Sequence, residues 1–475
     1  MIGSVAIVGA GPGDPGLVTE KGKALLERAD VIVYDRLVHP LILEHTKEEA
    51  VRVYSGKIPR GHATRQSTIQ AMLTRYARGG LFVVRLKGGD PGVFAHLGEE
   101  AEALRATGIS YEVVPGLTAG LAGASYAGVP ATYRSLSTSV AFVTGHARKE
   151  MPLTDVVLPR ADTLIFYMGM HYLPFWLERL AREGWSTETP VVVVQWGTTA
   201  KQRTVSGTVM TIASEVEAER ITNPALVIVG ETARFQADLQ WYEDLPLQGT
   251  SVLWAGEGVI DGEETGTERG ETTRMLTRLG AHVFSYPGDV FTFNRDGIRV
   301  PLTAYQRVHF EDACSVGFFL QYWKDEGYDL RRLPAYVTGA DAETEEALRE
   351  FGLPPEEDGE PELTVGARVN NEGSYWQIVD RQPSKLKADV FSRLVADDWI
   401  NMVLFTAPRE VHALAGKLDE ALAVWCADKT VVGVGVETRQ LLQSLGVRVD
   451  RHADEANREA LASLLSSSCA VVAAQ

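Results

Sequence analysis

The stretches SVAIVGAGPGDP (residues 4–15) and LFVVRLKGGDP (residues 81–91) decide the fold, because each passes from an apolar run directly into a glycine-rich turn. A short apolar run that ends at glycine and proline is typical of a buried strand. A helical pattern follows the first turn, from about Thr19 to Ala29. Further apolar runs occupy residues 31–34, 111–114, 140–143, 163–167, 191–194 and 226–229. This alternation predicts an α/β fold with largely parallel sheets.

Turns of small residues follow five of the predicted strands. They lie at residues 9–15, 87–91, 114–119, 167–169 and 197–199. Ligands of open α/β sheets bind beyond the carboxyl ends of the strands, and glycine lets a ligand approach the backbone closely. We therefore expect these turns to form one ligand cleft.

The first turn departs from the glycine pattern of dinucleotide-binding proteins. Asp14 stands where that pattern has its third glycine, and Pro12 and Pro15 offer no N–H group to a phosphate. The turn therefore favours a ligand without phosphates. A nicotinamide-dependent oxidoreductase stays as the less favoured alternative.

Composition and charge narrow the class of protein. The chain has 475 residues and a formal net charge of -17, which argues against a nucleic-acid partner. No apolar run reaches the length of a membrane span and the first residues do not resemble a signal peptide, so we expect a cytoplasmic protein. Cys314, Cys426 and Cys469 are too far apart in sequence to suggest a metal cluster, and we expect no bound metal.

The chain divides near residue 250. The polar stretch 236–249 precedes a new predicted strand at 251–254, so we predict one domain over 1–245 and another over 250–475. Within the second domain, a strand, a glycine turn and a helix begun by threonine occur twice, at Thr344 and at Thr438. Threonine is a natural N-cap, and the repeat predicts two similar α/β lobes.

Residues 1 to about 245 resemble the uroporphyrinogen-III C-methyltransferases of the tetrapyrrole methylase family. The matching stretches occur in family order; they are VGAGPGDPGLVTEKG, ADVIVYDRLV, GK at 56–57, VVRLKGGDP, GEEAEAL, VVPGLTAGLAGASYAGVP, FVTGH, TLIFYMG, QRTVSGT and NPALVIVGE. The resemblance implies two α/β lobes with S-adenosylmethionine bound between them, a homodimer formed through this half, and a small-molecule tetrapyrrole substrate. The implied reaction is methylation of uroporphyrinogen III to precorrin-2 in two transfers, which leaves S-adenosylhomocysteine. The sequence leaves open whether the product feeds sirohaem or cobalamin.

The resemblance also implies roles for single residues. It places the cofactor on Pro12, Gly88, Gly89, Asp90, Val93, Thr118, Ala119, Met168 and Gly197. It makes Asp35 the proton acceptor and Lys57 a proton donor. This suits the chemistry, since methylation leaves a cationic ring that a carboxylate can stabilise and deprotonate. The substrate carries eight carboxylates in this family, and the candidate clamps for them are Arg36, Lys57, Arg85 and Arg134. Ordinary surface roles are the alternative.

The substrate side of the pattern shows departures from the family. AHLGEE at residues 95–100 replaces a family GRGGEE run, and Thr132-Tyr133-Arg134 replaces THR. The loops assigned to the cofactor match the family.

Residues 250–475 resemble uroporphyrinogen-III synthase over residues 308–316, the Thr344 helix, 403–411 and 434–438. This implies cyclisation of hydroxymethylbilane to uroporphyrinogen III, with Thr406 and Thr438 on substrate carboxylates. N-cap roles for both threonines are the alternative. The strand at 251–254 lacks the family's Thr-Arg-Pro, and Asp380 stands where the family has tyrosine. A non-catalytic binding or regulatory module is therefore the alternative for this half.

Overall fold

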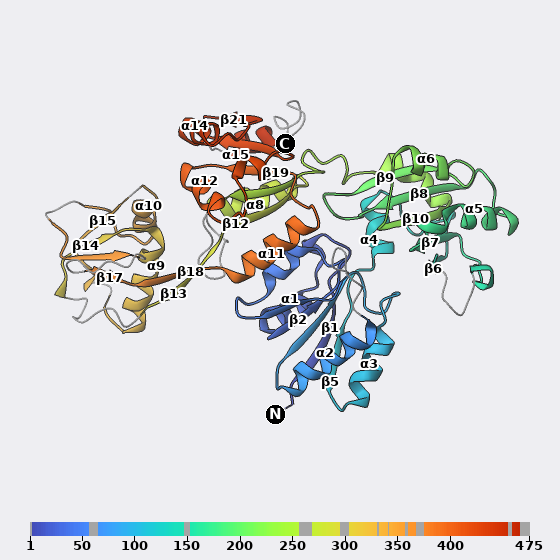
Figure 1. Cartoon of the computed structure of the whole chain (residues 1–475), viewed down its shortest axis with the longest axis horizontal. Helices are drawn as coiled ribbons and strands as arrows, with labels where there is room; N and C mark the ends of the chain where they lie inside the picture. The colour runs from blue at the N-terminus through green and yellow to red at the C-terminus, as the bar shows by residue number, and fades with distance from the viewer. Residues whose placement is uncertain are drawn as a thin grey trace. The chain divides into compact units, whose positions relative to one another are not determined.

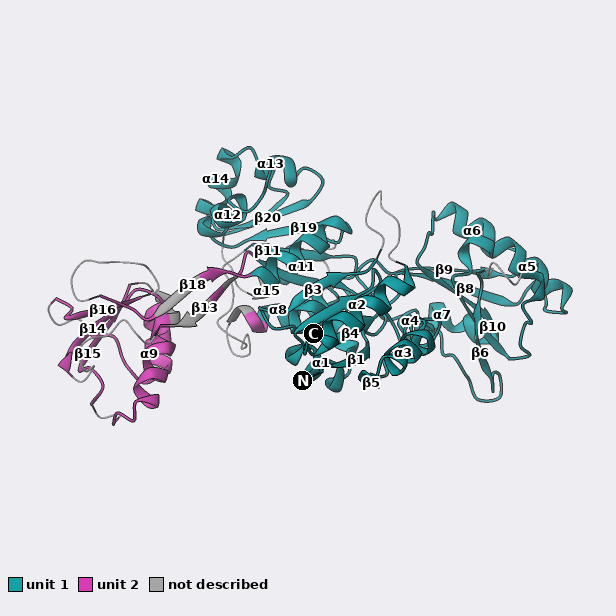
Figure 2. Cartoon of the chain, turned by 60° about the horizontal axis from the view of Figure 1, so that its bottom comes forward, with its two compact units in different colours: residues 1–255, 272–286, 385–475 teal, residues 256–271, 287–384 magenta. Residues whose placement is uncertain are grey.

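The computed structural model describes residues 2–56, 65–146, 153–255, 268–294, 304–329, 332–340, 342–356, 360–366, 375–454 and 458–465. Figure 1 shows the whole chain, which forms two compact units that Figure 2 draws in different colours. The first contains residues 1–255, 272–286 and 385–475, and the second contains residues 256–271 and 287–384. The α/β fold class is confirmed in both units.

The first sheet is fully parallel and has the order β3-β2-β4-β1-β5. Its strands are β1 (Ser4–Gly9), β2 (Val31–Tyr34), β3 (Val51–Tyr54), β4 (Val83–Lys87) and β5 (Ser110–Val114). The connecting helices and 3-10 turns are η1 (Pro15–Leu17), α1 (Glu20–Arg28), η2 (Pro40–His45), α2 (Gln66–Arg78) and α3 (Leu97–Ala106). Thr19 caps α1, because its hydroxyl accepts a hydrogen bond from the Gly22 backbone N–H at 3.1 Å. The predicted strands and the start of the helix are confirmed.

The second sheet, of order β6-β7-β10-β8-β9, is mostly antiparallel. Its strands are β6 (Val140–Thr144), β7 (Thr163–Tyr167), β8 (Pro190–Gln195), β9 (Arg203–Thr208) and β10 (Ala225–Gly230). The helical segments around it are α4 (Ala119–Tyr126), η3 (Leu153–Asp155), η4 (Met170–Tyr172), α5 (Leu173–Arg182), α6 (Ile212–Ala218), η5 (Glu231–Phe235) and α7 (Gln236–Leu239). Among the described strands of this sheet, only β6 and β7 pair in parallel. The expectation of a largely parallel sheet is wrong here. For β8 and β9, the connection between the two strands is too short for a parallel crossover.

A third sheet, β12-β11-β19-β20-β21, belongs to the same unit and is parallel throughout. It contains β11 (Ser251–Ala255), β12 (His282–Tyr286), β19 (Met402–Phe405), β20 (Thr430–Val434) and β21 (Arg451–Ala453). Its helices are α8 (Glu268–Arg278), α11 (Lys385–Ala396), α12 (Pro408–Ala415), α13 (Leu422–Trp425), α14 (Val436–Ser444) and α15 (Arg458–Leu465). The domain boundary near residue 250 remains a prediction. By packing, this sheet belongs to the same compact unit as the first half of the chain.

The second unit holds the four-stranded parallel sheet β15-β14-β16-β17 and the antiparallel ribbon of β13 and β18. The elements are β13 (Asp289–Phe293), β14 (Arg307–Phe310), α9 (Ala313–Asp325), β15 (Tyr336–Gly339), α10 (Ala342–Glu350), β16 (Leu363–Gly366), β17 (Tyr375–Gln377) and β18 (Val379–Pro383). The predicted repeat is present as β15–α10 and β20–α14. The predicted N-cap role of Thr438 is wrong, because Gly435 caps α14 and Thr438 lies inside its first turn.

The third sheet docks on the first half through η2 and α11. Arg52, whose side chain is 1% exposed, pairs with Asp389 at 3.1 Å. The Glu48 carboxylate accepts hydrogen bonds from the backbone N–H groups of Lys385 and Leu386, at the N-terminus of α11. A single hydrophobic cluster contains residues of both parts, among them Ile42 and Phe391. No pattern in the sequence predicted this docking.

Within the described ranges, no helix is long and apolar enough to cross a membrane. The same part of the chain contains no group of three histidine, cysteine or acidic residues that could hold a metal ion. Cys426 is buried, and burial raises the pKa of its thiol to about 12. Cys469 lies outside the described residues.

The docking should weaken in acid because of two buried histidines. His39 and His282 lie 3.2 Å apart between Nε2 and Nδ1. Burial and the neighbouring His282 hold the pKa of His39 well below its ordinary 6.5, and burial lowers the pKa of His282 to about 4. Between these pH values the unfolded chain binds more protons than the folded chain, so stability falls as the pH falls from about 6.5 to 4.

We expect the melting temperature of the wild-type chain to drop across this pH window. His282→Gln, which cannot titrate there, should flatten the drop. An equally steep drop in the variant, followed by differential scanning fluorimetry, would assign the acid sensitivity to other groups.

Candidate functional site

Three backbone segments meet where β1, β4 and β5 end. A methyl group added at Gly9 would lie 2.5 Å from the Gly116 nitrogen and 2.7 Å from the Gly89 oxygen. Gly11 and Gly89 are joined by a pair of backbone hydrogen bonds, at 2.7 and 3.2 Å. Only glycine permits this approach, so the predicted turns leave the sheet from one point.

Asp90 fastens two of these turns together. Its carboxylate accepts hydrogen bonds from the backbone N–H groups of Gly92 at 2.7 Å and Gly116 at 3.0 Å. The carboxylate is therefore already engaged in holding the loop, and Val93 follows on the same turn, donating its N–H to the Asp90 carbonyl at 3.2 Å.

Tyr167, at the end of β7, reaches the N-terminus of α4. Its hydroxyl accepts a hydrogen bond from the Gly120 N–H and shares another with the Thr118 hydroxyl, both at 2.6 Å. Burial raises the pKa of Tyr167, so the phenol stays neutral. The second sheet is thereby tied to the loop that carries Thr118 and Ala119.

The loop after β8 is strained and is tied to the first turn. Trp196 and Thr198 adopt positive φ angles of 47° and 71°, as does Met168 after β7 at 57°. Such conformations are costly for residues with side chains and gather at functional sites. The Asp14 N–H donates to the Thr198 hydroxyl at 3.1 Å, which joins the turn containing Pro12 to the loop containing Gly197.

The structure thus brings together the loops that carry all nine residues predicted to bind the cofactor. Most of these residues are partly buried, Thr118 is buried, and the Met168 side chain is 47% exposed. Their roles remain predictions.

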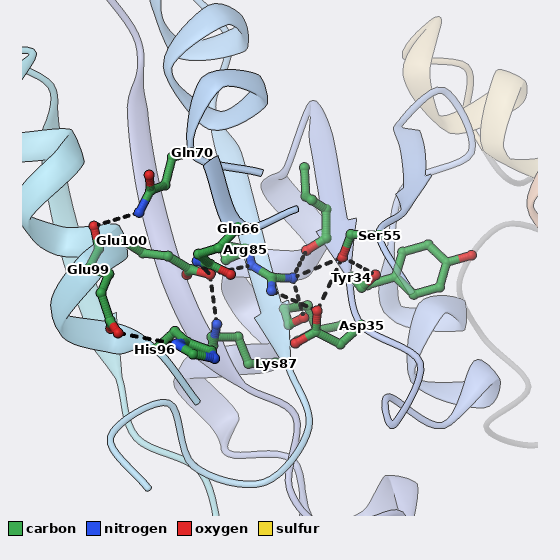
Figure 3. A network of polar contacts seen from close by, with 12 residues as sticks. Tyr34, Asp35, Ser55, Gln66, Gln70, Arg85, Lys87, His96, Glu99 and Glu100 are labelled. Carbon is green, nitrogen blue, oxygen red and sulfur yellow. Dashed lines mark hydrogen bonds and ion pairs between the residues drawn. The ribbon is translucent and has the colours of Figure 1, made fainter. Parts of the chain in front are cut away.

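Asp35 stands at this edge of the first sheet, directly after β2, and is held by buried partners (Figure 3). Its Oδ1 accepts hydrogen bonds from Arg85 Nη2 at 2.6 Å and from Ser55 Oγ at 3.1 Å. The Asp35 side chain is 31% exposed and that of Arg85 only 2%. The candidate role of Arg85 as a substrate clamp is therefore wrong, whereas Asp35 combines a fixed orientation with access to solvent.

A second buried carboxylate completes the network. Glu100 Oε1 accepts hydrogen bonds from Lys87 Nζ at 2.8 Å, Arg85 Nε at 3.2 Å and Gln66 Nε2 at 2.9 Å. Lys87 and Glu100 are 2% and 0% exposed. Burial and the positive charge of Arg85 lower the pKa of Lys87, which Glu100 opposes.

Sequence reasoning missed this network, although one signal was available. Arg85 and Lys87 are two apart in an apolar strand and so project from one face, where buried cations require a carboxylate partner.

The remaining predicted residues are placed as follows. Lys57 lies outside the described residues. Arg36 and Arg134 are exposed. Thr406 is partly buried, and its backbone N–H and hydroxyl both donate to the Glu410 carboxylate at the start of α12. Thr438 is 1% exposed.

Several known proteins are similar to this chain in sequence. A sequence profile described as Tetrapyrrole (Corrin/Porphyrin) Methylases matches residues 4–213. A uroporphyrinogen-III C-methyltransferase of Bacillus subtilis is 38% identical over 376 residues, which cover 77% of this chain and 76% of the relative. One from Priestia megaterium is 48% identical over 237 residues, covering 49% of this chain and 100% of the relative.

Two further similarities concern about half of the chain. A siroheme synthase of Pseudomonas fluorescens is 47% identical over 244 residues, covering 51% of this chain and 52% of the relative. The solved structure of a Thermus thermophilus uroporphyrin-III C-methyltransferase complexed with S-adenosylhomocysteine is 37% identical, covers 49% of this chain and 99% of its own, and has a TM-score of 0.42.

Removing the buried Glu100 carboxylate should destabilise the first unit. Glu100→Ala leaves Arg85 and Lys87 buried without their shared partner, and breaking a buried ion pair in this way costs roughly 3 kcal/mol. Glu102→Ala, on the exposed face of the same helix, should change stability by less than about 0.5 kcal/mol. Denaturant unfolding followed by circular dichroism measures both, and equal midpoints for the two variants would show that the network does not stabilise the fold.

Proposed function

This chain belongs to the family of tetrapyrrole (corrin/porphyrin) methylases, and from this premise we propose that its first half transfers methyl groups from S-adenosylmethionine to uroporphyrinogen III. The observation that carries the proposal is Asp35, a partly exposed carboxylate fixed by a buried arginine on the turn beside the glycine loops. The proposed product is precorrin-2, formed by two successive transfers.

The residues present fit a sulfonium cofactor. The backbones of Gly9, Gly89 and Gly116 approach one another closely at the strand ends, and Pro12 lacks the N–H group that a phosphate would need. When bound, S-adenosylmethionine supplies an electrophilic methyl group. Pro12, Gly88, Gly89, Asp90, Val93, Thr118, Ala119, Met168 and Gly197 would hold it.

Asp35 would act on the ring after methylation. The methylated pyrrole is cationic and must lose a proton from carbon, and a nearby carboxylate both stabilises the cation and accepts that proton. The Arg85 guanidinium keeps Oδ1 in place, so the other oxygen stays available to the substrate. We assign proton donation to Lys57, and binding of the substrate carboxylates to the exposed Arg36 and Arg134.

For the second half we propose cyclisation of hydroxymethylbilane to uroporphyrinogen III, the substrate of the first half. Two observations support this proposal. Residues 250–475 resemble the synthase family, and the chain passes from one parallel sheet to another and then back to the first. Thr406 and Thr438 would bind substrate carboxylates, although Thr438 would first have to become exposed. A non-catalytic regulatory module is the second candidate, favoured by the burial of Thr438 and by Asp380 in the place of a tyrosine.

We also propose that the protein is a cytoplasmic homodimer joined through its first half. Exposed apolar side chains on β5, on α4 and on the loop between them support this contact; they are Tyr111, Val113, Leu117 and Leu121. Light scattering that gives the mass of one chain would contradict the dimer.

One anaerobic experiment tests both halves. The purified protein is given hydroxymethylbilane and labelled S-adenosylmethionine, and the ring isomer and methyl count of the product are determined. A dimethylated type III ring supports both activities. A methylated type I ring, formed after spontaneous closure, supports the methyltransferase with a non-catalytic second half. No methyl incorporation, even with uroporphyrinogen III supplied, would overturn the main proposal.

Asp35→Asn should slow methyl transfer roughly 100-fold or more, because the amide cannot accept the proton. Binding of S-adenosylhomocysteine, measured by isothermal titration calorimetry, should stay unchanged. Asp238→Asn, on the exposed surface of α7, is the matched control and should leave both unchanged. A variant that loses cofactor binding instead would contradict the assigned role.

Gly116→Ala should weaken binding of S-adenosylhomocysteine at least about tenfold, since overpacking at this contact forces the backbones apart. Gly317→Ala, where a methyl group meets no atom within 4 Å, should bind normally. Addition of NAD or NADP should raise the melting temperature of neither variant nor of the wild type. Normal affinity in Gly116→Ala would mean that the cofactor binds elsewhere.

A further inference from the structure

The corner between α11 and β19 in the C-terminal half contacts the methylase half at two places. Its central residue is Trp399, which is 5% exposed. The Trp399 ring packs against His39 and against Trp196, with ring centroids 4.4 and 5.2 Å apart. Lys201 Nζ lies 4.5 Å from the centroid of the same ring and donates a hydrogen bond to the Asp397 carbonyl at 2.9 Å.

The contact with His39 leads to the proposed proton acceptor. His39 follows a tight turn in which the Val38 N–H donates to the Asp35 carbonyl at 3.2 Å. The backbone of Leu37, in the same turn, lies 3.2 Å from the position that a Gly88 side chain would take. His39 is therefore linked through this turn both to Asp35 and to the loop at Gly88.

The contact with Trp196 and Lys201 leads to the other wall of the cleft. These residues flank Gly197 and Thr198, in a loop whose positive φ angles persist only where packing enforces them. Thr198 in turn accepts the hydrogen bond from the Asp14 N–H. Loss of support at Trp399 would let this loop relax and would release the first turn as well.

We propose that Trp399 is a positioning residue for methyl transfer, through which the C-terminal half fixes the geometry of the cofactor cleft. The inference rests on the proposed function of the first half and is independent of any reaction in the second. A single ring supports the turn of Asp35 from one lobe and the Gly197 loop from the other. Because methyl transfer requires close alignment, a displacement of about 1 Å is enough to cost a large part of the rate.

The test uses the full chain with Trp399→Ala, Trp399→Phe and the matched control Trp425→Ala. Trp425 is also buried, but its ring contacts Phe391 and the Lys429 ammonium group, both of which lie in the C-terminal half. Circular dichroism and melting temperature monitor folding. The measured quantities are the Kd of S-adenosylhomocysteine and the kcat and KM of methyl transfer to uroporphyrinogen III.

We expect Trp399→Ala to lower kcat/KM for S-adenosylmethionine about tenfold or more. Trp399→Phe should restore kcat/KM to within about threefold of the wild-type value. Trp425→Ala should leave kcat/KM unchanged although it makes the fold less stable. Lys201→Met, which removes the ammonium group from the ring, should act in the same direction by about threefold, and it decides the matter if Trp399→Ala does not fold. Equal effects of Trp399→Ala and Trp425→Ala on kcat/KM would overturn the inference. Unchanged kinetics in Trp399→Ala would also overturn it, as would unchanged kinetics in Lys201→Met if Trp399→Ala does not fold. An inactive wild type would instead refute the proposed function.

Discussion

The close approach of three backbones at Gly9, Gly89 and Gly116 is the constraint on which the site depends. Side chains are excluded from this point, so three loops leave the first sheet together and diverge only afterwards. Asp90 then bonds to the loop of Gly116, and Asp14 bonds to the loop of Gly197. The candidate cofactor site is therefore built from loops that are hydrogen-bonded to one another.

Beneath the cleft, charge is buried in a way that orients one exposed group. Two cations, Arg85 and Lys87, share one oxygen of Glu100, and Arg85 extends to Asp35. Burying these charges costs several kcal/mol unless each finds a partner. This arrangement preorganises the Asp35 carboxylate. The buried ion pairs fix its Oδ1, and its other oxygen stays available to the substrate.

The sequence predicted what is local and missed what depends on long-range pairing. Strands and turns around Gly9 and Gly89 follow from hydrophobic runs and glycine, and the α/β class followed from their alternation. Strand direction in the second sheet could not be predicted in this way, because an apolar run such as Val191–Val194 fits a parallel and an antiparallel strand equally well. Glu100 lies in a helix start that reads as solvated, GEEAEAL, and only the fold reveals its cations. The docking of Trp399 on His39 joins residues that no sequence pattern relates.

The surface around η2 is made early and covered late. Residues of the first half can pair their strands soon after they leave the ribosome, because chains fold from the N-terminal part onward. His39 and Ile42 are nevertheless covered only when α11 and Trp399 have been synthesised, after the whole inserted second unit. During that interval an apolar face is open to water. Translation speed and chaperones that shield such faces thus become part of how much of this protein reaches its native state.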